Sequence, residues 1–176
     1  MNDVLTVHVH EAIAAEDHLS TDIQYYRNKD AIYSVYPPTA FLTFAYWIYA
    51  VPPFKPKDML MLGYAGGTVA GLVQQIYGDV PITGVDQTIY DNRYHVNLVK
   101  ADARDFVKLS KPYDCVIVDL FDGLLTPSFV GDPDFAKEVC RITGDFLVIY
   151  LTEFSYQSSS KILGSLNSWP CAHSEA

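Results

Sequence analysis

Asp58-Met-Leu-Met-Leu-Gly-Tyr-Ala-Gly-Gly-Thr68 is the most informative segment of this 176-residue chain. Its apolar run, Met59–Leu62, is typical of a short strand that is buried on both faces of a sheet. Three glycines follow, and apolar side chains then recur at helical spacing from Val69 to Ile76. Gly78 stands where the C-terminus of a helix favours glycine. Strand, glycine turn and helix in this order predict the opening of a nucleotide-binding α/β domain.

The glycine turn itself has two interpretations. Glycines at 63, 66 and 67 would let a ligand approach the backbone closely, beside the free N–H groups of a helix start. A purely structural turn is the alternative, because the spacing differs from the dinucleotide fingerprint, in which glycines occupy the first, third and sixth places. The same mismatch disfavours an NAD-dependent oxidoreductase.

Composition and charge narrow the class of protein. Apolar residues make up 49% of the chain, which suits one folded domain with a sizeable core. We therefore expect a single domain over 1–176, with a strand and helices in 1–56 and a ligand-binding core in 57–176. The net charge of −9 argues against a general nucleic-acid binder and is compatible with a cationic small substrate.

The cysteines and the N-terminus indicate the compartment. The three cysteines are widely spaced and form no CxxC pair, which predicts a reducing, cytoplasmic setting and gives no zinc signature. No basic region precedes an apolar core at the N-terminus, so we expect no signal peptide. His8, His10 and His18 complete no known metal-ligand spacing with a carboxylate, and we expect no metal site.

Three segments precede the glycine strand. Val4–His10 alternates apolar and polar residues, which predicts a half-buried strand at an edge or in a hairpin. We read the polar, tyrosine-bearing segment Asp17–Ser34 as a helix. Thr39–Val51 is almost wholly apolar and lies between two proline pairs, which predicts a helix packed on the sheet. Its aromatic face could instead form a homodimer contact, and its 13 residues are too few to span a bilayer.

Aspartates follow the next two predicted strands. Val80–Val85 ends in Asp86, about 20 residues after the glycines, where an acidic residue binds both hydroxyls of a ribose. A helix N-cap is the alternative role for Asp86. A short connection leads to a third strand at His95–Val99, and Asp102 follows it at the start of a predicted helix. Asp102 can cap that helix or accept a hydrogen bond from an adenine amino group.

The fourth predicted strand, Tyr113–Asp119, is followed closely by a second carboxylate at Asp122. Ligands bind at the carboxyl ends of central parallel strands in open α/β sheets, and a carboxylate there can act as a general base. The structural alternatives are a helix cap at Asp119 and a plain turn at Asp122. Further on we expect a helix opened by Asp132-Pro-Asp-Phe, a fifth strand at Gly144–Leu151 and a last helix at Ser155–Leu166.

Asp86, Asp102 and Asp119 thus each follow a predicted parallel strand behind one glycine turn. This order resembles the class I S-adenosylmethionine-dependent methyltransferase fold, an α/β three-layer sandwich with a Rossmann-like central parallel sheet. More narrowly, the chain resembles the spermidine synthase (polyamine aminopropyltransferase) family over roughly residues 57–153.

Four segments carry the resemblance. Leu62-Gly-Tyr-Ala-Gly-Gly-Thr68 is similar to the glycine loop of the family, with Ala65 where glycine is usual. Val85-Asp86 is similar to its ribose-binding segment, with Asp in place of the usual Glu. The most specific matches are Asp102-Ala-Arg-Asp-Phe106, similar to the adenine-contacting segment, and Tyr113-Asp-Cys-Val-Ile-Val-Asp119-Leu-Phe-Asp122-Gly123, similar to the catalytic strand.

The resemblance implies a site for S-adenosylmethionine or its decarboxylated form as co-substrate, without a metal. The residues implied to bind the nucleoside are Gly63, Tyr64, Ala65, Gly66, Gly67, Asp86, Asp102 and Ala103. Asp119 would deprotonate the attacking amine, and Asp122 would help to hold a cationic polyamine. The chain is shortened at both ends relative to the family, and its C-terminal part of the sheet is reduced.

Three functions therefore stay open. The first is an aminopropyltransferase-like enzyme that acts on a polyamine. The second is a small methyltransferase with an unknown acceptor, which the same site would serve. The third is a non-catalytic nucleoside-binding or interaction module, in which the aromatic segment at 39–51 would matter as an interface.

Overall fold

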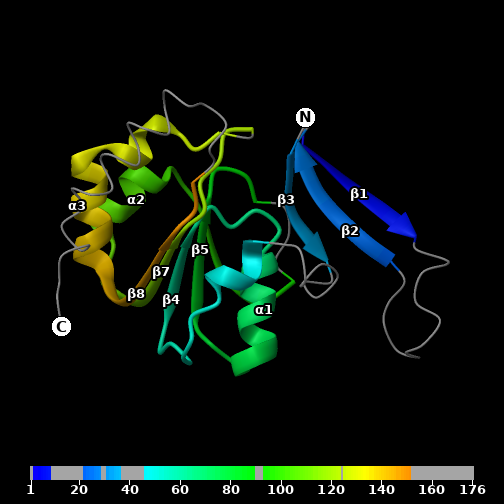
Figure 1. Cartoon of the computed structure of the whole chain (residues 1–176), viewed down its shortest axis with the longest axis horizontal. Helices are drawn as coiled ribbons and strands as arrows, with labels where there is room; N and C mark the ends of the chain where they lie inside the picture. Colours follow the sequence, from blue (N-terminus) through cyan, green and yellow to red (C-terminus); the bar gives the residue numbers. More distant parts are fainter. Residues whose placement is uncertain are drawn as a thin grey trace.

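The computed structural model describes residues 2–8, 22–28, 31–36, 46–89, 93–123 and 125–151. Its centre is a five-stranded sheet in which every pairing is parallel (Figure 1). The strands are Met59–Leu62 (β4), Ile82–Asp86 (β5), Asn97–Lys100 (β6), Tyr113–Val118 (β7) and Thr143–Ile149 (β8). All five predicted strands of the core are confirmed, with ends shifted by a few residues.

The strand order is β6-β5-β4-β7-β8. The chain enters the sheet at its central strand, β4, moves outward to β6 and then crosses to β7 on the other side of β4. This is the doubly wound arrangement, and it creates a topological switch point between β4 and β7. The carboxyl ends of these two strands are therefore where a ligand crevice is expected.

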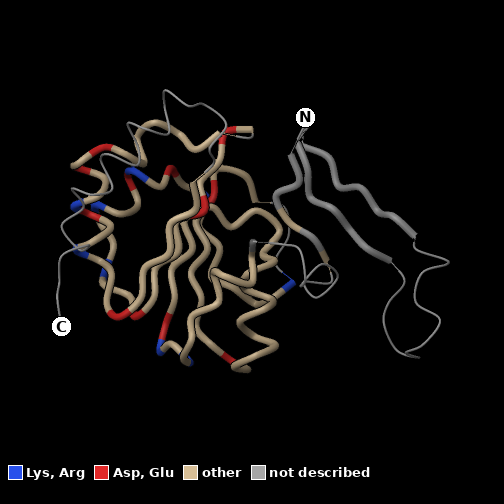
Figure 2. The backbone as a smooth tube through the Cα atoms, in the orientation of Figure 1, with Lys and Arg blue, Asp and Glu red and all other residues tan. Residues whose placement is uncertain are grey.

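Helices cover both faces of the sheet. Thr68–Tyr77 (α1) lies on one side, and Ala103–Leu109 (α2) and Pro133–Ile142 (α3) lie on the other (Figure 1). Short 3-10 helices at Tyr46–Ala50 (η1) and Ser128–Gly131 (η2) accompany them. Figure 2 shows that charged residues gather over α2 and α3, whereas α1 carries none. The structure thus has the three α/β layers that we predicted.

The side chains of β4 explain why helices pack against both faces of the sheet. Met59 and Met61 point into the apolar cluster on the α1 side, and Leu60 and Leu62 point into the cluster on the α2 and α3 side. All four are at most 1% exposed. Burial of each such side chain contributes about 1.5–3 kcal/mol, so the continuous apolar run of β4 holds both helical layers.

The helix boundaries follow the expected capping chemistry. Asp102 caps α2 through a 2.9 Å bond from the Arg104 N–H, and Asp132 caps α3 through a 3.0 Å bond from the Asp134 N–H. At the end of α1, the Gly78 N–H donates to the Gln74 carbonyl, and the φ of Gly78 is +73°. The three predicted ends are confirmed.

The N-terminal part contains a second sheet in place of the predicted helix. Asn2–His8 (β1), Asp22–Asn28 (β2) and Ala31–Tyr36 (β3) pair antiparallel in that order. The edge strand predicted from Val4 is confirmed as β1. The helix predicted over Asp17–Ser34 is wrong: aromatic and β-branched residues are concentrated in both segments, and such residues favour strands when a partner strand is available.

The other N-terminal and C-terminal predictions fall largely outside the described residues. Of the apolar helix predicted at 39–51, residues 46–50 form η1, in which Trp47 and Ala50 are buried. Residues 39–45, His10, His18 and the helix predicted at 155–166 lie outside the described ranges. No helix within those ranges is long and apolar enough to cross a membrane.

Candidate functional site

Gly63 and Asp119 are in close backbone contact at the switch point of the sheet. Gly63 follows β4 with a φ of +90°, and a Cβ at this position would collide with the backbone oxygen of Asp119 and lie 2.7 Å from its carbonyl carbon. The Asp119 N–H donates to the Leu62 carbonyl at 2.8 Å. Glycine is therefore required at 63 for conformation and for space, and it brings the end of β7 against the glycine loop.

Asp86 joins the end of β5 to the same loop. Its Oδ2 accepts a 2.8 Å bond from the Ala65 N–H, and its Oδ1 accepts a 2.9 Å bond from the Thr88 N–H. A carboxylate has about four lone-pair positions, so two remain for hydroxyl groups of a ligand. The bond from the Thr88 N–H closes a local Asx-type turn. Asp86 therefore accepts from the backbone just after it, as the alternative role of an N-cap would require.

The amide groups of the glycine loop are already used within the protein. A phosphate-binding loop needs several N–H groups that face the ligand, whereas these donate to protein oxygens. The four bonds are Gly63 to Val85 O, Ala65 to Asp86, Gly66 to Ser34 Oγ and Gly67 to Tyr64 O. This arrangement favours a ligand without phosphate, such as a nucleoside.

Tyr64 supports the loop from inside the core. Its side chain is 2% exposed, and a Cβ at either Gly67 or Gly84 would lie 2.5 Å from an atom of its ring. The next residue, Ala65, has a φ of +48°, a left-handed conformation that L-residues seldom adopt. Among the predicted nucleoside-binding residues, Tyr64 is thus available to a ligand mainly through its backbone.

Ser34 of β3 is a part of this site that the sequence analysis missed. Its side chain is 2% exposed and its Oγ accepts a 3.0 Å bond from the Gly66 N–H. The contact joins the N-terminal sheet to the glycine loop. A polar residue 32 positions before its partner, in a segment that we read as a helix, gave no signal of this role.

Asp102 is held by its neighbour Arg104. The guanidinium donates to both carboxylate oxygens, at 3.0 Å from Nε and 2.6 Å from Nη2, and this hydrogen-bonded pairing lowers the pKa of Asp102. Gln87 approaches the same carboxylate at 3.4 Å. The predicted cap role of Asp102 is confirmed, and Ala103 is buried at the first position of α2. A contact with adenine stays a prediction and would have to share this carboxylate with Arg104.

Asp119 lies next to Tyr150, which the sequence analysis counted only as a strand residue. The Tyr150 N–H donates to the Val118 carbonyl at 2.9 Å, so the first residue after β8 stands beside the end of β7. Burial raises the pKa of the Tyr150 phenol, and the negative charge of Asp119 raises it further. The ends of β7 and β8 therefore combine a carboxylate with a protonated phenol.

Asp122 belongs to a tight turn. Its N–H donates to the Leu125 carbonyl at 2.8 Å, the Leu125 N–H donates back at 3.1 Å, and Gly123 has a φ of +63°. Asp122 thus forms the plain turn that was the alternative to a functional role. Its side chain is exposed, and its role in binding a substrate stays a prediction.

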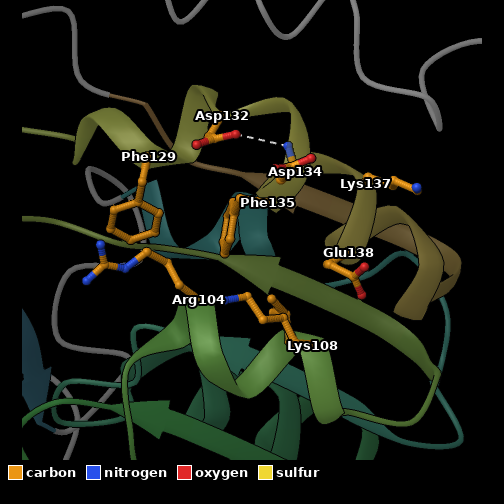
Figure 3. A pocket seen from close by; sticks show the side chains of 9 residues that line it. Arg104, Lys108, Phe129, Asp132, Asp134, Phe135, Lys137 and Glu138 are labelled. Atoms are coloured by element: carbon orange, nitrogen blue, oxygen red, sulfur yellow. Dashed lines mark hydrogen bonds between the residues drawn. The ribbon is translucent and has the colours of Figure 1, made fainter.

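A cavity of about 430 Å³ lies apart from the switch point, between α2, η2 and α3 (Figure 3). Its lining combines aromatic rings with side chains of both charges: Arg104, Val107, Lys108, Phe129, Asp132, Asp134, Phe135, Lys137 and Glu138. The guanidinium of Arg104 lies 4.9 Å from the centre of the Phe129 ring. Arg104 is the link to the predicted site, because it also holds Asp102.

The structure therefore brings together the glycine loop, Asp86 and Asp119, and it gives Asp102 a charged partner and Asp122 a turn. No known protein family matches the chain, and no curated protein matches its sequence at a significant level. The chemical interpretation of the site consequently rests on its residues and their geometry.

Proposed function

We propose that this chain is a spermidine synthase-like transferase that binds S-adenosylmethionine or its decarboxylated form and transfers a group to an amine. The observation that carries the proposal is the Gly63–Asp119 contact. It puts a carboxylate-bearing strand end against a glycine loop at the switch point of the sheet, where ligands of doubly wound folds bind. The strand order also supports a fold of the class I methyltransferase type.

The residues at the switch point fit a phosphate-free nucleoside. Four loop amides donate inside the protein, which leaves them unavailable to a pyrophosphate. Asp86 keeps acceptor positions that a ribose could use. Asp102 and Ala103 stand at the end of the next strand, β6, on the side of β5 where the rest of a nucleoside would extend.

Asp119 acts in this mechanism as the proton acceptor. An amine is an ammonium ion at neutral pH and must lose a proton to the carboxylate before its nitrogen can attack. The bound sulfonium supplies an activated carbon, whose bond to sulfur breaks with its electron pair leaving on sulfur as the bond to nitrogen forms. Asp119 then releases its proton to water. The backbone of Gly63 and the carboxylate of Asp86 fix the alignment on which such a displacement depends.

Calorimetric titration of the purified protein tests this proposal. The ligands are S-adenosylmethionine, its decarboxylated form, methylthioadenosine and NAD. Preferential binding of the decarboxylated form supports aminopropyl transfer, and preferential binding of S-adenosylmethionine supports a methyltransferase. Absence of binding of all four at millimolar concentration overturns both enzyme functions and leaves the non-catalytic interaction module.

The predicted cytoplasmic location belongs to the same proposal. Cys115 is a buried free thiol, which a reducing compartment allows, whereas Cys140 is disulfide-bonded, which an oxidising compartment favours. Cell fractionation therefore decides the location. Calorimetric titration with a polyamine tests the predicted small-molecule amine. Sedimentation tests the second predicted partner, another copy of the chain bound through residues 39–51.

A further inference from the structure

The cavity between α2, η2 and α3 has an apolar floor, formed by Val107, Phe129 and Phe135, and a charged rim (Figure 3). Val107 and Phe135 are buried in the core, and Phe129 packs against that core. The rings of Phe129 and Phe135 meet edge to face, with their centroids 5.2 Å apart. Small-molecule sites combine apolar walls of this kind with a few fixed polar groups, and a volume of about 430 Å³ is in their range. The floor therefore suits a ligand with an aromatic ring.

The charged side chains of the rim lie on two sides of the rings. Arg104 and Lys108 of α2 lie below them in Figure 3, and Asp132 and Asp134 at the start of α3 lie above them. Asp132 already accepts the N–H of Asp134 as the cap of α3. Lys108 makes an exposed ion pair of 3.4 Å, which solvent screens. Arg104 is different, because two other side chains hold its guanidinium in place.

The Arg104 guanidinium is a preformed anchor for an anion. Its Nε and Nη2 donate to the Asp102 carboxylate at 3.0 and 2.6 Å, and its Cζ lies 4.9 Å from the centre of the Phe129 ring. Of the five N–H groups of a guanidinium, three thus keep no acceptor within the part of the chain that the structure describes. One of these on Nη1 and one on Nη2 are parallel, which is the geometry that binds both oxygens of a carboxylate. Because the side chain is already held, binding an anion costs little further entropy.

The charges around the cavity favour a carboxylate over a cation or a phosphate. The guanidinium would repel a cationic group that packed on the Phe129 ring beside it. A phosphate dianion would be repelled by Asp132 and Asp134 across the cavity and by Asp102 behind Arg104. A carboxylate carries one charge, and its two oxygens match the two parallel N–H groups.

We infer that this cavity binds a small aromatic carboxylate, whose ring packs on Phe129 and Phe135 and whose two oxygens accept from Arg104. Lys108 is four residues further along α2, on the same face of the helix, and adds a second positive charge on that side. The cavity lies apart from the switch point, so the inference does not rest on the proposed transferase function. It adds a second ligand site to the domain.

Ligand analogues test the inference on the unmodified chain. 3-Phenylpropionate should shift the ¹H–¹⁵N NMR signals of Val107 and Phe135 in a saturable titration at millimolar concentration. 3-Phenylpropionamide lacks the charge and acetate lacks the ring. Each should bind at least about tenfold more weakly, because the first loses a hydrogen bond between charged groups and the second the burial of a ring. Unshifted signals of Val107 and Phe135, or tighter binding of 2-phenylethylamine or inorganic phosphate, overturn the inference.

Substitution of Arg104 tests the anchor. Arg104→Gln should weaken the binding of 3-phenylpropionate about tenfold or more, since hydrogen bonds between charged groups are worth at least that ratio. Arg104→Lys keeps the charge without the planar fork and should recover only part of the affinity. Lys55→Gln is the matched control, because Lys55 is also exposed, lies outside the cavity lining and loses the same charge. Full affinity in Arg104→Gln, or an equal loss in Lys55→Gln, overturns the inference.

Substitution of Phe129 tests the floor. Phe129→Leu should weaken binding about two- to tenfold, the value of an aromatic contact beyond its area. Phe54→Leu is the matched control, because Phe54 is half-buried like Phe129 and also forms an edge-to-face pair, with Phe146 at 5.9 Å. Equal affinities in the two variants overturn the role of the ring. If no sulfonium ligand binds, the proposed function fails in its own titration, whereas 3-phenylpropionate still decides whether this second site exists.

Discussion

The Asp86 carboxylate accepts a 2.8 Å hydrogen bond from the Ala65 N–H, so the end of β5 holds the glycine loop in the position that it has beside β4. Asp86→Ala should lower the free energy of unfolding by about 1–3 kcal/mol, because two partly buried N–H groups lose their acceptor. Asp86→Asn keeps one acceptor oxygen and should cost less. Urea unfolding measures both values, and equal stability of Asp86→Ala and the wild type contradicts this account.

The same pair predicts the binding of a nucleoside. Asp86→Asn has one acceptor oxygen where the wild type has two, and it lacks the charge. Its affinity for the sulfonium ligand should fall about tenfold, as expected for the loss of a hydrogen bond to a charged acceptor. Calorimetry on a variant that circular dichroism shows to be folded checks the value. Unchanged affinity would assign the ribose contact elsewhere.

Gly63→Ala should prevent folding or lower stability by more than about 3 kcal/mol, since it combines a left-handed backbone conformation with a collision between two backbones. Gly123→Ala is the matched control. Gly123 also has a positive φ, of +63°, but a Cβ there would meet nothing within 4 Å. It should cost about 1–2 kcal/mol, the price of the conformation alone. Similar losses in the two variants would show that the Gly63–Asp119 contact is not tight in solution.

Ser34→Ala should lower the free energy of unfolding by about 1–3 kcal/mol, because the buried Gly66 N–H loses its acceptor. Ser34→Thr retains the hydroxyl and serves as the comparison. Thermal unfolding measures the stability, and ligand titration tests whether the loop still binds. A loss of affinity in Ser34→Ala alone indicates that the N-terminal sheet holds the loop in its binding conformation.

The pairing of Asp102 with Arg104 predicts a dependence of stability on pH. The pKa of Asp102 is lower in the folded protein than in the unfolded chain, because Arg104 hydrogen-bonds its charged form. The pairing therefore stabilises the fold above the unfolded pKa of about 3.9 and is lost as the pH falls through the folded value. Because Arg104 is largely exposed, solvent screens the pairing and its contribution is small.

Asp102→Asn isolates the contribution of the ion pair to stability, because asparagine also caps helices. Urea unfolding at pH 7 should find it less stable than the wild type, and the difference should shrink as the pH falls through the lowered pKa of Asp102 in the folded protein. Asp132→Asn changes the equivalent cap of α3 and is the control for the cap itself. A difference between Asp102→Asn and the wild type that does not change as the pH is lowered would exclude the ion pair as its cause.

The sequence predicted the central sheet well because its strands contain short apolar runs, and the two strands at its centre, β4 and β7, are buried on both faces. It also predicted the aspartate caps, since an Asp before a helical segment satisfies free N–H groups locally. The N-terminal hairpin was misread because its alternation is weak and a strand needs a partner that lies elsewhere in the chain. In a segment such as Asp22–Asn28, pairing with β1 and not local propensity decides the secondary structure.

The candidate site was predictable in its carboxylates and much less so in their partners. Asp86, Asp102 and Asp119 stand at strand ends, and their positions follow from the order of the elements. Ser34 and Tyr150 reach the site only through tertiary packing, and nothing in their neighbouring residues indicates it. The bond between Arg104 and Asp102 is local, and the charge pattern at these two positions could have suggested it.

The junction of α3 and β8 has no connecting residue: the helix ends at Ile142 and the strand begins at Thr143. α3 and β8 are thus joined directly. Residues of α3 line the 430 Å³ cavity, and Tyr150 directly follows β8. A displacement of α3 has no loop to absorb it and is taken up at Thr143 and at the register shift that follows it in β8, or passed along the strand. Insertions at this junction should consequently displace Tyr150, at the carboxyl end of β8.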